Sequence, residues 1–178
     1  MVSPMYSIVI PVYRNEESIP ALLEALDGLA SEVDGPLEVV FVVDGSPDSS
    51  FLRLEEGLQG ASFDARLILL SRNFGAFSAI RCGLRHASGE YIGVMASDLQ
   101  EPPELMLEFF RALSGKPLDV VFGRRLSRSD PGVSKLASNI FWAAYRRFVQ
   151  PDVPVGGVDV FAVTANFRNR LVALEESN

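Results

Sequence analysis

The sequence predicts an α/β fold in which a mostly parallel, twisted sheet carries helices on both faces. Five short runs are almost continuously apolar, as expected for parallel strands that are buried on both sides. Stretches with helical spacing of apolar residues lie between these runs, and repeated strand–helix units imply right-handed crossovers. At 178 residues, the chain is long enough for one domain with a substantial core.

The predicted strands cover residues 6–11, 37–43, 66–70, 91–95 and 119–122. The first predicted helix has Ser18 as candidate N-cap and Pro20 in its first turn, where proline is tolerated. Its apolar stripe consists of Ile19, Leu22, Leu23, Leu26 and Leu29. Another helix follows Pro102 and Pro103, and its stripe consists of Leu105, Met106, Phe109, Phe110 and Leu113. Residues 140–148 and 167–178 also have helical patterns, and the second pattern runs to the last residue.

The composition excludes several classes of protein. A net charge of −7 argues against a general nucleic-acid binder. The single cysteine, Cys82, allows no internal disulfide and is expected to be a small buried thiol. No apolar run approaches the roughly 18–20 residues that span a bilayer, and the N-terminus has no signal-peptide pattern.

The charge is distributed unevenly along the chain. Residues 1–122 contain 8 Lys and Arg and 18 Asp and Glu, which gives −10, whereas residues 123–178 contain 8 and 5, which gives +3. The basic part is interpreted either as a solvated face or as a surface that meets phosphates or an anionic membrane. Within it, the segment 123–128, "GRRLSR", offers guanidinium groups suited to phosphate, although a solvated run of charges is an equally simple interpretation.

Polar residues follow each predicted strand, at the edge of the sheet where ligands of such folds bind. Asp44, in "VVDGSPDSS", either accepts a hydrogen bond from a ribose or base, or forms a turn. Asp98 and Gln100 both offer oxygen to a hard cation, but Asp98 could instead cap the helix after Pro102. His86 is expected at an exposed position in the middle of a helix. The sequence contains no zinc cluster, nucleophile elbow or P-loop.

Six segments occur in order over nearly the whole chain: "IVIPVYRNEESI", "VVDGSPDSS", "LSRNFGAFSAIRCGLRHASGEYI", "SDLQEPPE", "GRRLSR" and "GGVDVF". With them the chain resembles the family 2 inverting glycosyltransferases of the GT-A fold. Its pattern is most similar to the branch that moves sugars onto polyprenyl phosphates, the dolichol-phosphate-mannose-synthase-like enzymes. The resemblance implies a nucleoside-diphosphate sugar (UDP or GDP) as donor, a polyprenyl phosphate as acceptor, and Mg²⁺ or Mn²⁺. It also implies membrane contact on the cytoplasmic side, and a homo-oligomer is compatible with it.

The resemblance assigns roles to individual positions. The nucleotide sugar would contact Pro11, Tyr13, Asn15, Glu16, Asp44, Arg72, Ser97 and Asp98. Asp98 and Gln100 would hold the cation. Arg125, Arg128 and Lys135 would face phosphates of the donor or acceptor. Asp159 falls near where this fold places its base or acceptor-side acid, so Asp159 and Asp98 would be the catalytic residues.

The chain departs from the family pattern at three positions. Val43 and Ala96 each replace the first acid of a motif, and Asn15 stands where an acid is common, beside Glu16. The alternatives are therefore a polysaccharide- or LPS-type glycosyltransferase that uses a sugar hydroxyl as acceptor, with Asp159 as base, or a degenerate, non-catalytic nucleotide-sugar-binding domain. A nucleotidyltransferase would need a glycine-rich loop that "IPVYRNEES" lacks. Because members of the branch commonly continue into membrane segments, the chain is expected to be the catalytic domain of a longer protein.

Overall fold

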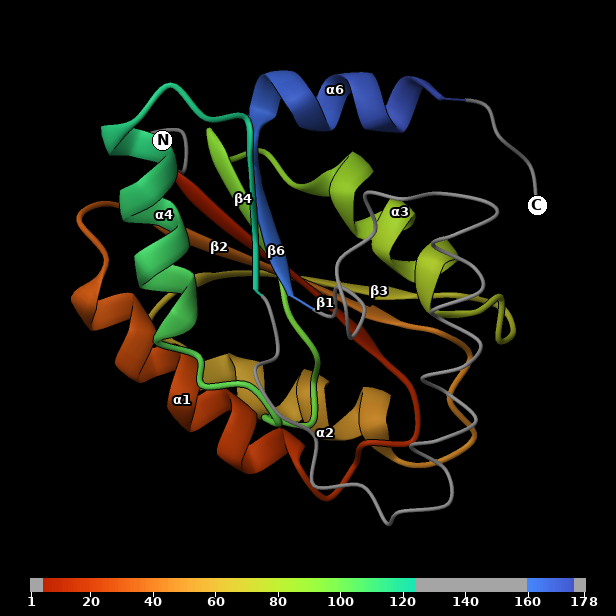
Figure 1. The fold of residues 1–178 in the computed structure, drawn as a ribbon. Helices are drawn as coiled ribbons and strands as arrows, with labels where there is room; N and C mark the ends of the chain where they lie inside the picture. The colour runs from red at the N-terminus through yellow and green to blue at the C-terminus, as the bar shows by residue number, and fades with distance from the viewer. Residues whose placement is uncertain (1–4, 124–159, 175–178) are drawn as a thin grey trace, which may run out of the picture.

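The computed structural model describes residues 5–123 and 160–174. They form a six-stranded sheet with the strand order β3-β2-β1-β4-β6-β5, flanked by helices on both faces (Figure 1). The elements are β1 (Tyr6–Val12), α1 (Ile19–Glu32), β2 (Leu37–Val43), α2 (Ser50–Gly57), a 3₁₀ turn η1 (Leu58–Gly60), β3 (Asp64–Leu69), α3 (Ala76–His86), β4 (Tyr91–Val94), α4 (Leu105–Gly115), β5 (Val120–Phe122), β6 (Phe161–Thr164) and α6 (Ala165–Ala173).

The sheet is parallel from β3 through β2 and β1 to β4, and β6 is inserted antiparallel between β4 and β5. The predicted α/β class with helices on both faces is thus confirmed. All five predicted strands exist, with boundaries that differ by at most two residues. The sixth strand, β6, was not predicted, because its four residues are too few for a period to stand out.

Two cores form because successive side chains of a strand point to opposite faces. Ile8, Ile10 and Val12 of β1 lie in the core covered by α1, α2 and α4, whereas Val9 lies in the core under α3 and α6. The predicted stripe of α1 is mostly buried: Ile19, Leu22, Leu26 and Leu29 are at most 3% exposed, while Leu23 is half-buried at the edge of this core. The helix α1 is therefore held by packing of its apolar stripe on the sheet.

The structure corrects several local expectations. β3 was expected to be buried on both faces, but it is an edge strand with four exposed residues. Ser18 occupies the N-cap of α1 without capping it, since its hydroxyl donates to the carbonyl of Asn15. The last helix ends at Ala173, because Leu174 is its C-cap and has an extended backbone. Cys82 is half-buried, and burial raises the pKa of its thiol. His86 is exposed as expected, but it ends α3.

Among the described residues, no helix has both the length and the apolar character needed to cross a bilayer. The predicted helix at 140–148 lies outside the described residues.

Candidate functional site

A cavity of about 270 Å³ lies at the carboxyl ends of β1, β2 and β4. The strand order reverses between β1 and β4, because β2 and β3 lie on one side of β1 and β4 lies on the other. Such a switch point is where open α/β sheets bind ligands, since the loops leave the sheet in opposite directions there. The cavity is lined by Pro11, Val12, Tyr13, Asn15, Asp44, Asn73, Ala76, Ala96, Ser97 and Asp98.

The loops after β1 and β2 are joined by hydrogen bonds in both directions. The Glu16 amide donates to Asp48 Oδ2 at 3.2 Å, and the Ser49 amide donates back to Glu16 Oε2 at 2.8 Å. The amide of Arg14 also donates to Ser46 Oγ at 2.7 Å. These bonds fix the position of Tyr13 and Asn15 at the cavity wall. Glu16 itself is engaged at the start of α2 and does not line the cavity.

Asp48 is the centre of this loop junction. Burial by itself would raise the pKa of its carboxyl, but hydrogen bonds from Ser46 Oγ and from the Ser50 and Glu16 amides outweigh it and lower the pKa to about 2. A carboxylate that accepts several hydrogen bonds is favoured in its charged form. Asp48 is therefore ionised at neutral pH and holds the two loops together.

Asp44 holds a third loop in place. The residue is 2% exposed, and its two carboxylate oxygens accept from the amides of Phe74 and Gly75, at 2.8 Å each. These amides lie at the amino end of α3, where backbone N–H groups have no partner within the helix. Asp44 thus caps α3 from a neighbouring strand and fixes Asn73 and Ala76 against the cavity.

Asp98 is exposed in the loop after β4, which forms another part of the cavity wall. Gln100 approaches it from two residues on: the Gln100 Nε2 donates to Asp98 Oδ2 at 2.7 Å, and the Gln100 amide donates to Oδ1 at 3.3 Å. The two side chains lie together, as the sequence predicts. They meet in a turn, whereas the sequence predicted an extended strand there. Asp98 does not cap the following helix, because Glu104 occupies the N-cap of α4.

Backbone strain is concentrated around this cavity. Within the part of the chain that the structure describes, Arg14 and Leu99 are the non-glycine residues with positive φ, at 55° each. Arg14 directly follows Tyr13 and Leu99 directly follows Asp98, so each strained residue adjoins a cavity wall. Such conformations cost about 1–3 kcal/mol and cluster at functional sites, where surrounding contacts maintain them.

Asp98 offers one exposed carboxylate to a hard cation, and the side-chain amide of Gln100 turns its nitrogen toward that carboxylate. Within residues 5–123 and 160–174, no three His, Cys, Asp or Glu side chains gather into a group that could hold a metal ion, at this cavity or elsewhere. Mg²⁺ bound with phosphates takes only one or two protein oxygens, so one exposed carboxylate beside a cavity is sufficient. Ala96, where a second acid is usual in the resembled family, lines the same cavity and contributes no oxygen from its side chain.

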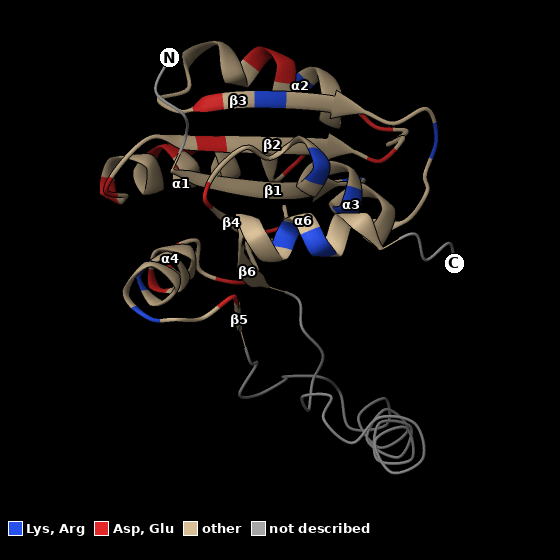
Figure 2. Ribbon diagram, turned by 90° about the horizontal axis from the view of Figure 1, so that it is seen from above, with Lys and Arg blue, Asp and Glu red and all other residues tan. Residues whose placement is uncertain are grey.

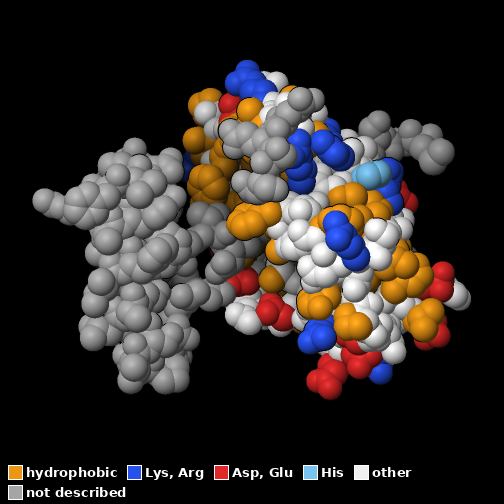
Figure 3. Space-filling view, turned by 90° about the vertical axis from the view of Figure 1, so that its right-hand side faces the viewer, with side chains coloured by type: hydrophobic (Ala, Val, Ile, Leu, Met, Phe, Trp, Pro, Cys, Tyr) orange, Lys and Arg blue, Asp and Glu red, His pale blue; other side chains and the backbone are white. Residues whose placement is uncertain are grey.

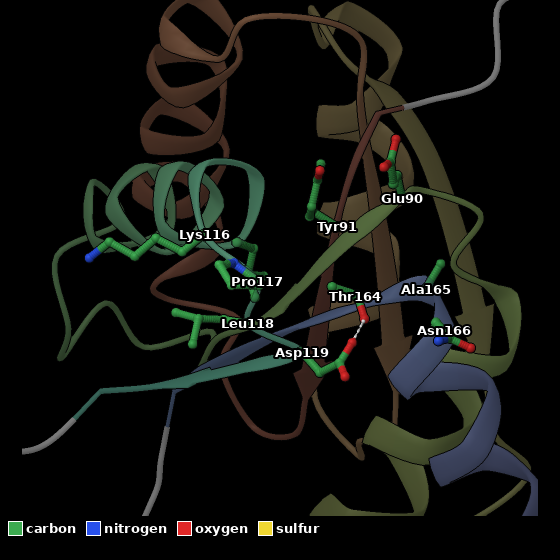
Figure 4. A pocket seen from close by; sticks show the side chains of 10 residues that line it. Glu90, Tyr91, Lys116, Pro117, Leu118, Asp119, Thr164, Ala165 and Asn166 are labelled. Carbon is green, nitrogen blue, oxygen red and sulfur yellow. Dashed lines mark hydrogen bonds between the residues drawn. The ribbon is translucent and has the colours of Figure 1, made fainter.

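A second, larger cavity of about 590 Å³ lies at the opposite end of the sheet, where β4 and β5 begin (Figure 4). Thr164 Oγ1 donates to Asp119 Oδ1 at 2.8 Å on its wall, and Lys116 extends away from this pair. None of the residues predicted for the site lines this cavity.

The predicted site residues fall into three groups. Pro11, Tyr13, Asn15, Asp44, Ser97 and Asp98 line the smaller cavity together. Glu16, Arg72 and Gln100 lie in the same loops without lining it; the guanidinium of Arg72 stacks 4.8 Å from the centre of the Phe74 ring. Arg125, Arg128, Lys135 and Asp159 lie outside the described residues.

Sequence reasoning missed Val12, Asn73 and Ala76 as cavity-lining residues. Asn73 carries a signal that could have been found, since its side chain accepts from the Gly75 amide at 3.0 Å in an Asx-type turn that "RNFG" favours.

Comparison with known proteins identifies the family. The family model described as "Glycosyl transferase family 2" matches residues 7–174, which is nearly the whole chain. The chain belongs to glycosyl transferase family 2. It is 38% identical over 134 residues to the undecaprenyl-phosphate 4-deoxy-4-formamido-L-arabinose transferase of Proteus mirabilis, covering 75% of this chain and 41% of the relative. The transferase of that name from Sodalis glossinidius is 34% identical over 151 residues, covering 83% and 46%. The chain thus spans less than half the length of these relatives.

Solved glycosyltransferases of the GT-A fold share the architecture. The mannosyltransferase PcManGT of Pyrobaculum calidifontis, in complex with GDP-Man and Mn²⁺, superimposes with a TM-score of 0.66 at 19% identity, covering 96% of this chain and 47% of that one. Glucosyl-3-phosphoglycerate synthase of Mycobacterium tuberculosis, with Mn²⁺, UDP-glucose and phosphoglyceric acid, gives a TM-score of 0.58 at 21% identity, covering 92% and 57%. These similarities confirm the predicted fold of this glycosyl transferase family 2 chain.

Proposed function

We propose that the chain is a catalytic domain that transfers a sugar from a nucleoside-diphosphate sugar to a polyprenyl phosphate, with inversion at the anomeric carbon. The observation that carries the proposal is the cavity at the switch point, where the loop held by Asp44 and the exposed carboxylate of Asp98 meet. Family membership and the undecaprenyl-phosphate transferases among the relatives support the acceptor class.

The cavity walls match the parts of such a donor. Pro11 and Tyr13 offer an apolar and an aromatic surface to a base, and Asn15 and Asn73 offer amide groups to a ribose. Asp98, with Gln100 beside it, would hold Mg²⁺ or Mn²⁺ against the diphosphate. That cation supplies charge stabilisation for the leaving diphosphate. Arg72, in the loop beside Asp44, would add positive charge on the nucleotide side.

Acceptor chemistry determines which further residues are needed. A lipid phosphate is already anionic near neutral pH, so it can attack without a strong general base. In this proposal Arg125, Arg128 and Lys135 bind the acceptor or donor phosphates, and the site works at the cytoplasmic face of a membrane. If the acceptor were a sugar hydroxyl, Asp159 would be the base.

The first test is nucleotide binding by the chain itself. UDP or GDP at about 100 times its Kd should stabilise the fold by about 2.7 kcal/mol in the presence of Mn²⁺. Asp98→Asn should abolish the Mn²⁺-dependent part of this stabilisation. Asp64→Asn, at an exposed carboxylate that starts β3 at the other end of the sheet, should leave it unchanged. Equal Mn²⁺-dependent stabilisation in both variants would contradict the role of Asp98.

A degenerate domain that binds nucleotide sugars without transferring them is the second candidate, and Ala96 on the cavity wall favours it. A transfer assay with labelled donor sugar and polyprenyl phosphate separates the two candidates. Nucleotide binding without transfer, with donor and lipid both supplied, would select the binding domain.

A further inference from the structure

The helices on the two faces of the sheet carry opposite charge (Figure 2). The helices α1, α2 and α4 together contain six acids and two arginines, which gives −4. The helices α3 and α6 contain four arginines and no acid, which gives +4 in a chain whose net charge is −7. These four arginines are Arg81, Arg85, Arg168 and Arg170.

The two basic helices form one connected layer. Arg168 of α6 donates through Nη1 to the carbonyl of Leu84, at 2.9 Å, and to that of Ala87, so it satisfies carbonyls at the end of α3. Arg81 of α3 donates in turn to the carbonyl of Leu174, at the end of α6. Cations at helix C-termini are stabilising because the carbonyls there have no partner within the helix. Arg81 and Arg168 thus join the helices, while Arg85 and Arg170 are exposed.

An aromatic side chain projects from this layer. Phe77, in the first turn of α3, is 86% exposed, and Phe74 in the preceding loop is 46% exposed. Phe77, Arg81 and Arg85 are spaced four residues apart, which places them on one stripe of the helix. The face shown in Figure 3 has hydrophobic and Lys or Arg side chains side by side over its upper and central parts, with acidic side chains mostly toward the lower edge.

We propose that the α3/α6 face, defined by Phe74, Phe77, Arg85 and Arg170, docks on an anionic phospholipid surface. The arginines match the negative headgroups in charge, and Phe77 supplies an apolar anchor of the kind that interfacial helices insert. Ala76, the residue before Phe77, lines the candidate active site, so docking here would bring the cavity mouth to the membrane.

The choice of a membrane over an acidic protein rests on the proposed function, because a polyprenyl phosphate is reached only at a bilayer. The surface differs from the basic segment around Arg125 and Arg128, for which membrane contact is expected from the sequence. Binding to vesicles involves no sugar transfer, so this inference and the proposed function can fail separately.

The test is sedimentation of the 178-residue chain with vesicles of phosphatidylcholine containing phosphatidylglycerol. Each arginine near an anionic surface should raise the partition coefficient about fivefold, so the double variant Arg85→Gln/Arg170→Gln should lower it about 25-fold. Phe77→Ala should lower it roughly tenfold by removing the apolar anchor. Binding should also weaken in high salt and on neutral vesicles, because exposed charges are screened.

Matched controls exist on the opposite face. Arg53→Gln/Arg111→Gln removes two exposed arginines from α2 and α4, and Leu52→Ala removes a 57% exposed apolar side chain from α2. These variants should bind vesicles like the wild type, and urea unfolding should show that all variants remain folded.

Three results would overturn the proposal. The first is absence of binding to anionic vesicles. The second is an equal loss of vesicle binding in the α3/α6 variants and in their controls on the opposite face. The third is binding that depends on Arg125 and Arg128 but not on Arg85, Arg170 or Phe77. If the chain does not bind vesicles but self-associates through Arg85 and Arg170, then the α3/α6 face binds the acidic helices of a second copy of the chain instead of a membrane.

Discussion

Replacing Asp44 separates two roles for a buried acid on the cavity wall. Asp44 is 2% exposed, and its carboxylate accepts from the Phe74 and Gly75 amides at 2.8 Å each. A hydrogen bond to a charged group contributes about 1.5–3 kcal/mol. The loop that carries the two amides is largely exposed, so water can reach them in the variant and reduce the loss. We therefore expect Asp44→Ala to lower the free energy of unfolding by roughly 2–4 kcal/mol.

Urea unfolding followed by circular dichroism measures this loss, and an unchanged m-value would show that the unfolded state is not altered. Asn73→Ala is the matched control in the same loop. It removes one neutral hydrogen bond, to the Gly75 amide at 3.0 Å, and should cost only about 0.5–1 kcal/mol. A loss below about 1 kcal/mol for Asp44→Ala, together with abolished nucleotide binding, would refute the capping role and assign Asp44 to direct ligand contact.

Three further predictions concern the same loops. Asp48→Asn should lower the free energy of unfolding by no more than about 2 kcal/mol at pH 7. The pKa of Asp48 is lowered from 3.8 to about 2 in the folded protein, so its carboxylate stabilises the fold above pH 4 and loses this effect as the pH falls to 2. Unfolding measured over this pH range should therefore show the difference between variant and wild type above pH 4 and its disappearance near pH 2. Gly45→Ala should destabilise by about 3 kcal/mol in thermal unfolding, since φ is +57° and a Cβ would meet the Arg72 carbonyl carbon at 2.2 Å. Ala96→Asp should keep the fold and tighten Mn²⁺-dependent nucleotide binding measured by calorimetry; weaker binding would show that the site has reorganised around the missing acid.

Local patterns were sufficient for much of the fold. The run 37–43 is apolar at nearly every position and is β2, buried throughout, with the predicted boundaries. The stripe from Leu105 to Leu113 is the buried face of α4, apart from Leu105, which is half-buried. Both elements could be predicted because buried positions are apolar, and they recur along the chain with the period of the strand or helix that they belong to. The position of Asp98 and Asp44 at the same edge also followed from sequence, since parallel strands place all their carboxyl ends together.

Other features depend on contacts between segments that are distant in sequence. The four residues of β6 become a strand only by pairing with β4 and β5, and β3 is exposed only because no strand lies beyond it. The hydrogen bond from the Ser49 amide to Glu16, 33 residues away in the chain, likewise exists only because the fold brings the two loops together. The sequence by itself determined which residues could form strands, helices and polar edges, because those preferences are local. Only the tertiary structure decided which acids hold loops and which stay exposed at the cavity, because a carboxylate is engaged by whichever backbone amides the fold brings within hydrogen-bond distance.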